Sequence, residues 1–166
     1  VTESWNGTNW TTVNSLNDLT SEEFLLQIEK SFILTKSTEA YHPKSLHNLS
    51  MYFNESWYSL TIKDEFIEND NPVGCLDAQL LSTLVLSPIL GIHDLKTDNR
   101  VNFIEGTKGM IALQESVDSK KAKVAFGFFP VSIDQLKRVA DTNNIMPPKS
   151  TWIEPKIRSG LTVFEF

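Results

Sequence analysis

Residues 49–62 read LSMYFNESWYSLTI, and this stretch decides the fold. Two runs rich in aromatic and aliphatic residues, 49–53 and 57–62, flank the polar triplet Asn-Glu-Ser at 54–56. Aromatic and branched side chains favour strands, and Asn and Ser are frequent in tight turns. The stretch therefore predicts a β-hairpin. Its apolar and polar residues alternate imperfectly, so we expect the sheet to be covered on both faces.

Helices are predicted on both sides of this hairpin. Thr20 and Glu23 have the spacing of a capping box, in which the hydroxyl accepts from the third helical N–H and the carboxylate reaches back. Phe24, Ile28 and Phe32 recur at helical spacing, which places one face of this helix in the core. We expect helices over residues 20–31, 77–86, 107–117 and 133–140.

Strands alternate with helices late in the chain. Besides the hairpin, we expect strands over residues 32–36, 101–104, 123–129 and 161–166. The apolar run 123–129 suits a central strand, while residues 1–19 read as an irregular lead-in with one edge strand. Together these elements predict an α+β fold, with a mixed β-sheet packed against about four helices, in a single domain over residues 1–166.

Composition restricts the classes of function. The 166 residues carry a net charge of −6, and so acidic a chain lacks the basic surface that non-specific nucleic-acid binding requires. No run of about 18 apolar residues occurs, so no membrane-spanning helix is expected. Cys75 is the single cysteine, which fits a reducing compartment, and we expect a cytoplasmic protein. Cys75 itself is interpreted as a small buried hydrophobic residue.

A basic segment near the C-terminus is the candidate binding site. Residues 146–160 hold three cations and one acid, a charge of +2 that leaves −8 for the rest of the chain. Arginine can hold a carboxylate or phosphate through two parallel hydrogen bonds, lysine supplies a point charge, and hydroxyl groups add donors. The residues predicted to bind an anion are Lys149, Ser150, Thr151, Lys156, Arg158 and Ser159.

A structural role is the alternative explanation of this segment. Lys156 and Arg158 can pair with Glu154, Asp141 or the helix around Asp134 and hold the C-terminal strand in place. The spacing also differs from that of a phosphate-binding P-loop, so the resemblance to a phosphate cradle is one of composition only.

Other polar clusters give weaker signals. The acidic residues around Asp94 and Asp98 match no calcium loop and are interpreted as a solvated face. His42 and His47 lack a third ligand for zinc nearby in the sequence. Asp77 stands at a helix start, where the helix dipole favours it. No metal site is therefore predicted, and catalytic residues and cofactors stay open.

The end of the chain resembles a known family. The string MPPKSTWIEPKIRSGL over residues 146–161 follows Phe129-Pro130 and Val139-Ala140-Asp141. This order is similar to the C-terminal signature of the bacterial DUF1015 family, in which a Pro-Lys-Ser-Thr element precedes a Pro-Lys element and a Ser-Gly-Leu ending. Weaker resemblance covers most of the rest of the chain.

The resemblance implies that this chain is the C-terminal part of a longer protein. Family members carry an N-terminal half with its own histidine- and acid-containing motifs, which would be a partner in any shared site. The family has no assigned reaction, and its genes often lie beside serine-biosynthesis genes. It thus implies that the chain binds a small phosphorylated or carboxylated metabolite, linked to serine metabolism and turned over with the help of the N-terminal half. The alternative is a non-catalytic structural or interaction domain.

Overall fold

The computed structural model describes residues 9–151, which contain six strands and four α-helices. The strands are β1 Asn9–Val13, β2 Phe32–Ser37, β3 Asn48–Phe53, β4 Ser56–Ile62, β5 Val101–Glu105 and β6 Val124–Gly127. The α-helices are α1 Ser21–Ser31, α2 Asp77–Leu81, α3 Met110–Asp118 and α4 Ile133–Asp141. A π-helical segment, Ser82–Leu86, continues α2, and short 3-10 helices occupy Asp64–Phe66 and Gly106–Lys108.

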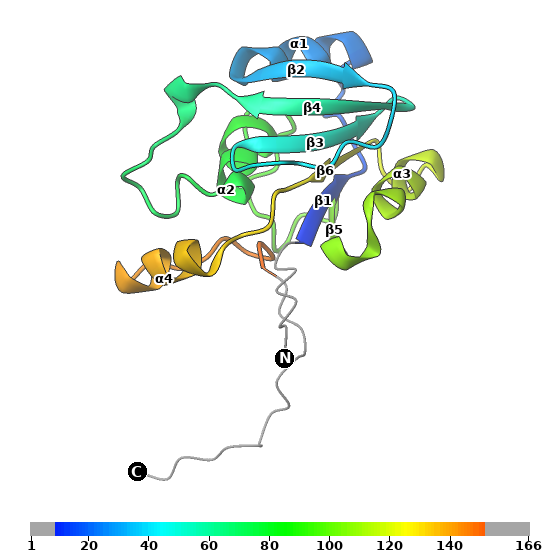
Figure 1. The fold of residues 1–166 in the computed structure, drawn as a ribbon. Helices are drawn as coiled ribbons and strands as arrows, with labels where there is room; N and C mark the ends of the chain where they lie inside the picture. The colour runs from blue at the N-terminus through cyan, green and yellow to red at the C-terminus, as the bar shows by residue number, and fades with distance from the viewer. Residues whose placement is uncertain (1–8, 152–166) are drawn as a thin grey trace, which may run out of the picture.

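The six strands form one sheet in the order β2-β4-β3-β6-β1-β5 (Figure 1). The predicted α+β fold is confirmed. All five strand pairings within residues 9–151 are antiparallel, so the sheet has no parallel neighbours in this range. β5 and β6 both run antiparallel to β1 and hence parallel to each other. The strand–helix–strand order expected late in the chain is therefore present as β5, α3 and β6. In the sheet, however, β1 lies between β5 and β6.

β1 corrects the prediction of an edge strand in the lead-in. It lies between β6 and β5, and all five of its residues are buried. Three of them, Asn9, Thr11 and Thr12, are polar, which made the segment look exposed in the sequence. The Thr12 hydroxyl donates to the Asn102 carbonyl at 3.4 Å, so this polar group has a partner inside the sheet. Among the strands of the described residues, β2 and β5 form the edges of the sheet.

The hairpin that decided the fold forms as predicted. Phe53 of β3 faces Ser56 of β4, and Asn54 and Glu55 make the turn with φ angles of 47° and 57°. Two successive residues with positive φ are typical of the type I′ turn, whose twist matches that of the two strands. The hairpin is central in the sheet, because β6 pairs with its β3 strand and β2 with its β4 strand.

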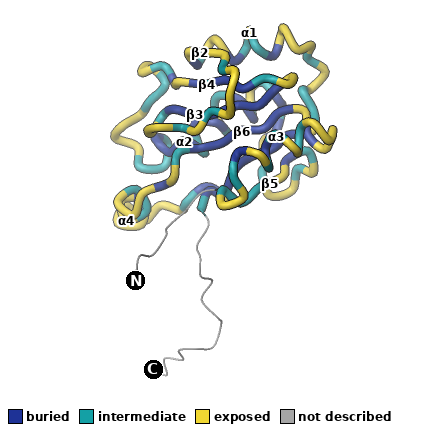
Figure 2. The backbone as a smooth tube through the Cα atoms, turned by 45° about the vertical axis from the view of Figure 1, so that its right-hand side comes forward, coloured by how far each residue is buried: buried dark blue, intermediate teal, exposed yellow. Residues whose placement is uncertain are grey.

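Helices cover both faces of the sheet. Side chains alternate along β3, so Tyr52 and Phe53 point to opposite sides. Tyr52 donates through its hydroxyl to Asp118 of α3 at 2.9 Å, whereas the Phe53 ring lies 5.1 Å from the ring of Phe24 in α1. The tube in Figure 2 shows the inner strands β1, β3, β4 and β6 largely buried between these layers, whereas β2, β5 and α4 are mostly intermediate or exposed. The largest fully buried side chains include Phe24, Phe32, Leu49, Met51, Leu60 and Phe126.

Several boundaries differ from the prediction. α1 begins after Thr20 with the predicted capping box in place. α3 begins at Met110 rather than at residue 107, because Gly109 has a φ of 77° and interrupts the helical backbone. The strand expected over 161–166 lies outside the described residues.

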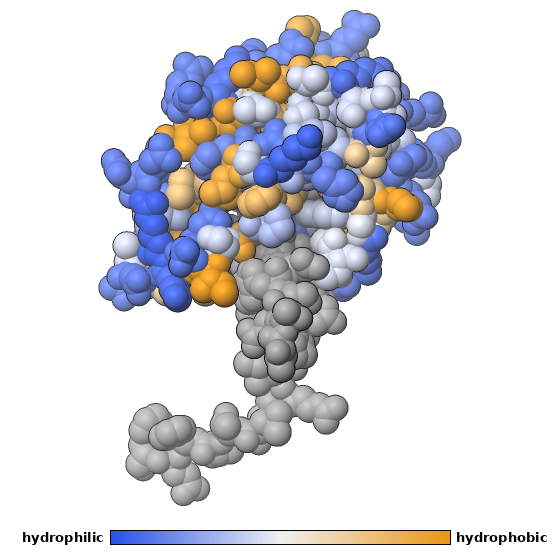
Figure 3. All heavy atoms as spheres, in the orientation of Figure 1, coloured by the Kyte–Doolittle hydropathy of each residue, from blue (hydrophilic) through white to orange (hydrophobic). Residues whose placement is uncertain are grey.

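The described surface is polar, with isolated apolar side chains. On the face drawn in Figure 3, hydrophilic residues predominate and hydrophobic ones are dispersed among them. The large exposed apolar residues, such as Leu26, Ile33 and Ile145, belong to different elements. Single exposed apolar residues are ordinary on protein surfaces. Within residues 9–151, no helix combines the length and apolar character needed to cross a bilayer.

Candidate functional site

The predicted anion-binding segment contains a tight turn over residues 147–150. The Ser150 N–H donates to the Pro147 carbonyl at 3.2 Å, which closes the turn. Pro148 occupies its second position, and Lys149 its third with a φ of 58°. Proline followed by a residue of positive φ is typical of a type II turn, in which the third position is usually glycine. The turn therefore presents Lys149 at its tip.

Ser150 and Thr151 anchor this turn to the rest of the fold. The Ser150 hydroxyl donates to the Pro147 carbonyl at 2.7 Å, and the residue is only 3% exposed. Its proton is thus used inside the turn, which gives Ser150 the role of positioning Lys149. The Thr151 carbonyl accepts from Asn9 Nδ2 at 3.3 Å, which ties the segment to the first residue of β1.

Lys149 carries a positive charge that no acid neutralises within residues 9–151. Its side chain is exposed, and the ion pairs of this range join other residues. Three further residues of the predicted site, Lys156, Arg158 and Ser159, lie outside the described residues. Within the described residues, Lys149, Ser150 and Thr151 of the predicted site thus lie in and directly after one turn, next to the start of β1.

The acidic loop around residues 94–100 is organised by its own contacts. The Asp98 carboxylate accepts hydrogen bonds from the backbone N–H, Nε and Nη2 of Arg100, and Nη2 lies 2.7 Å from Asp98 Oδ2. The Arg100 guanidinium thereby lowers the pKa of Asp98. The Asp94 carboxylate accepts from the backbone of Lys96 and the hydroxyl of Thr97, and these bonds lower its pKa. Arg100 also donates to the carbonyl groups of residues 90 and 91. These contacts stabilise the loop and connect its end to its beginning.

His47 and Asp77 form a second polar contact that the sequence did not indicate. The buried Asp77 carboxylate accepts from the His47 N–H at 2.9 Å and lies 3.2 Å from His47 Nδ1. Asp77 is the first residue of α2, where the predicted benefit from the helix dipole also applies. Its carboxylate thus joins the start of β3 to the start of α2. Cys75, two residues earlier, is buried and free, as predicted.

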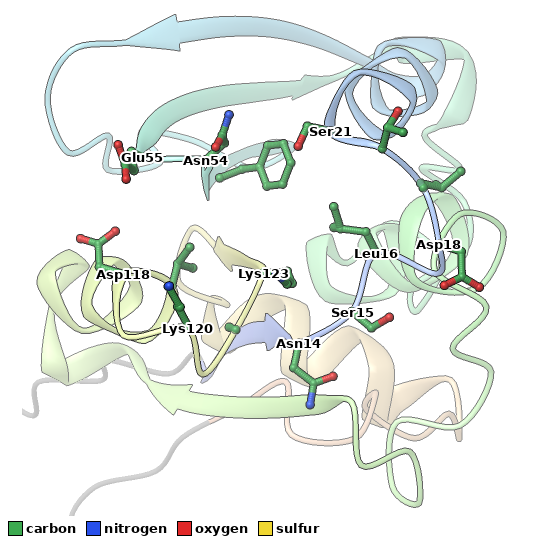
Figure 4. A pocket seen from close by; sticks show the side chains of 15 residues that line it. Asn14, Ser15, Leu16, Asp18, Ser21, Asn54, Glu55, Asp118, Lys120 and Lys123 are labelled. Atoms are coloured by element: carbon green, nitrogen blue, oxygen red, sulfur yellow. The ribbon is translucent and has the colours of Figure 1, made fainter.

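A cleft of about 690 Å³ lies at the other end of β1 from the Lys149 turn (Figure 4). Its walls come from the β1–α1 connection, the β3–β4 turn and the α3–β6 connection. The sequence predicted the hairpin turn and the α1 cap separately. No local pattern showed that the two meet, because their contact depends on the strand order.

No model of a protein family, no curated protein and no solved structure matches this chain significantly.

Proposed function

We propose that the chain binds a small phosphorylated or carboxylated metabolite at the corner formed by Lys149, Ser150 and Thr151. One observation supports this most directly: Lys149 is an exposed cation, held in a closed turn, without an acidic partner in residues 9–151. In this proposal Lys156 and Arg158 add positive charge to the site, and Ser159 adds a hydroxyl donor.

The conformation of Lys149 supports a binding role over a purely structural one. A non-glycine residue in the left-handed region costs about 1 kcal/mol, and glycine at the same position would avoid this cost. Such strain is found preferentially at functional sites. Because Pro148 and Ser150 already fix the turn, a bound anion would require little further ordering of the backbone.

The resemblance to the DUF1015 family reduces the range of ligands that we propose. On that basis we expect a cytoplasmic bacterial protein and a metabolite related to phosphoserine, turned over where an N-terminal half supplies the reactive groups. A non-catalytic structural domain is the second candidate. The hydrogen bond from Asn9 to the Thr151 carbonyl favours it, since the segment fastens β1 as well as presenting a charge.

Titration calorimetry on the chain of residues 1–166 tests the proposal with O-phospho-L-serine, inorganic phosphate and L-serine. We expect phosphoserine to bind most tightly and L-serine to give no measurable heat, because L-serine lacks the phosphate group. Lys149→Ala should weaken phosphoserine binding at least tenfold.

Lys36 provides the matched control, since it is an exposed lysine on edge strand β2. Lys36→Ala should bind phosphoserine like the parent chain. The proposal is wrong if phosphoserine and phosphate do not bind, or if the Lys149 and Lys36 variants bind equally well. The structural alternative predicts that Lys149→Ala leaves the ligand response unchanged, and that Asn9→Ala, which removes the donor to the Thr151 carbonyl, lowers the melting temperature.

A further inference from the structure

The cleft at the far end of β1 has an apolar floor. Phe53 and Ala122 contribute buried side chains, and Leu16 and Val117 contribute half-buried ones. Its volume of about 690 Å³ lies within the range of small-molecule sites, and five of its fifteen lining residues are apolar while ten are polar or charged. The floor can therefore accept an apolar side chain of a ligand.

Charges of both signs surround this floor. Asp18, Glu55 and Asp118 bring three carboxylates, and Lys120 and Lys123 bring two ammonium groups. In Figure 4, Glu55 and Asp118 lie on the same side of the pocket, while Asp18 lies on the opposite side beyond Leu16. Across the described part of the chain, none of these five charged groups is joined to another in an ion pair. Both signs are thus available to a ligand.

The fold positions several of these charges. The hydroxyl of the buried Tyr52 donates to Asp118 Oδ1 at 2.9 Å, which orients that carboxylate. Glu55 belongs to the type I′ turn, and Lys120 has a φ of 60° at the end of α3. Four of the eight non-glycine residues with positive φ in the described chain line this cleft, namely Asp18, Asn54, Glu55 and Lys120.

We propose that this cleft binds a small zwitterion of the dipeptide class, with a free ammonium group, a free carboxylate and an apolar side chain. The ammonium group would lie against Glu55 and Asp118, and the carboxylate against Lys120 and Lys123. The apolar side chain would rest on Leu16 and Phe53. Three carboxylates disfavour a simple anion, and two lysines disfavour a simple cation, so a ligand carrying both charges fits best.

Titration calorimetry with L-leucyl-L-leucine tests this inference on the chain of residues 1–166. We expect saturable binding, weakened at least tenfold by N-acetylation, by methyl esterification, or by shortening the ligand to L-leucine. Each blocked form keeps the apolar side chains but loses one charge. Equal binding of either blocked form would overturn the zwitterion assignment, and equal binding of L-leucine would overturn the assignment of size.

Variants of the cleft provide the second arm. Lys120→Gln with Lys123→Gln should weaken dipeptide binding at least tenfold, whereas Lys121→Gln should not change it. Lys121 is exposed and lies between the two lysines in sequence, but it does not line the cleft. Glu55→Gln should weaken binding similarly, and Glu115→Gln, outside the cleft, should not. The inference fails if the cleft variants bind like their controls, or if the parent chain does not bind the dipeptide.

Discussion

Gly127 shows how tightly single residues are packed in the middle of the sheet. A Cβ atom at this position would lie 2.5 Å from Ser50 Oγ and 3.3 Å from Leu113 Cδ1. Ser50 lies opposite Gly127 in the pairing of β3 with β6, and α3 covers both. Only a residue without a side chain fits between the serine hydroxyl and the helix.

Gly127→Ala should therefore destabilise the fold by about 1–3 kcal/mol, the usual cost of overpacking a core. Ser50→Ala removes the atom that the new methyl group would meet first. The double variant should accordingly recover at least half of the loss, as measured by urea unfolding. Destabilisation that is the same with and without Ser50→Ala would show that this contact is not the cause.

Tyr52 is a residue whose environment makes stability depend on pH. Burial, and then the hydrogen bond to Asp118, raise the pKa of its hydroxyl from 10.0 to about 12. The folded state favours the neutral hydroxyl, so this stabilising contribution is complete below pH 10. It should be lost as the pH rises through about 12.

Ultraviolet absorbance of tyrosinate checks this expectation. The parent chain has three tyrosines, and the part of its absorbance change that occurs near pH 12 should be absent in the Tyr52→Phe variant. In the same variant, the free energy of unfolding should decrease less at alkaline pH than it does in the parent chain. An unchanged titration curve in Tyr52→Phe would contradict the assignment.

At the scale of elements, two helices begin with the same device. Thr20 caps α1 and Ser132 caps α4, and in both a side chain at the third helical position completes the capping box. The helices differ in what they bury. Phe24 and Ile28 of α1 are buried in the core, whereas in α4 only Val139 is buried. Loss of the α1 cap should therefore lower the global free energy of unfolding, whereas loss of the α4 cap should mainly affect the local unfolding of α4.

Thr20→Ala should lower the global free energy of unfolding by about 1 kcal/mol, because the Glu23 N–H loses its acceptor. Ser132→Ala should mainly accelerate hydrogen exchange within α4 and change global unfolding less. Urea unfolding and amide exchange measure the two effects, with Ser21→Ala as the control for loss of a neighbouring hydroxyl. Equal global effects of both cap variants would show that α4 unfolds together with the sheet.

At the scale of the whole molecule, the two proposed sites lie at opposite ends of one strand. Thr151 contacts Asn9 at the start of β1, and Asn14, just after its end, lines the cleft. Five residues of strand separate them by about 15 Å. This distance exceeds the Debye length of about 8 Å at physiological ionic strength, so charges at one site are screened from the other.

The two sites should consequently be independent. Lys149→Ala should leave dipeptide affinity within about twofold of the parent value, and the double lysine variant of the cleft should do the same for phosphoserine, since distant sites behave additively. Calorimetric titration of each variant with each ligand checks this. A tenfold cross-effect would indicate that β1 couples the two ends.

The sequence by itself determined the local elements of this protein. The hairpin at 49–62 and the cap at Thr20 depend on neighbouring residues, so composition and spacing were sufficient to predict them. The anion-binding role of Lys149, Ser150 and Thr151 is a prediction from composition alone, and the sequence did not predict the turn in which Lys149 lies. The structure shows this turn, which is closed by the hydrogen bond from the Ser150 N–H to the Pro147 carbonyl.

Only the tertiary structure decided the strand order and the cleft. The polar threonines of β1 concealed an inner strand, because burial there depends on β5 and β6, which follow about a hundred residues later. Glu55, Lys120 and Asp18 belong to three separate connections, and only long-range pairing brings them around one floor. Local patterns carry no information about which distant segments meet, since that choice is made by packing of the whole core.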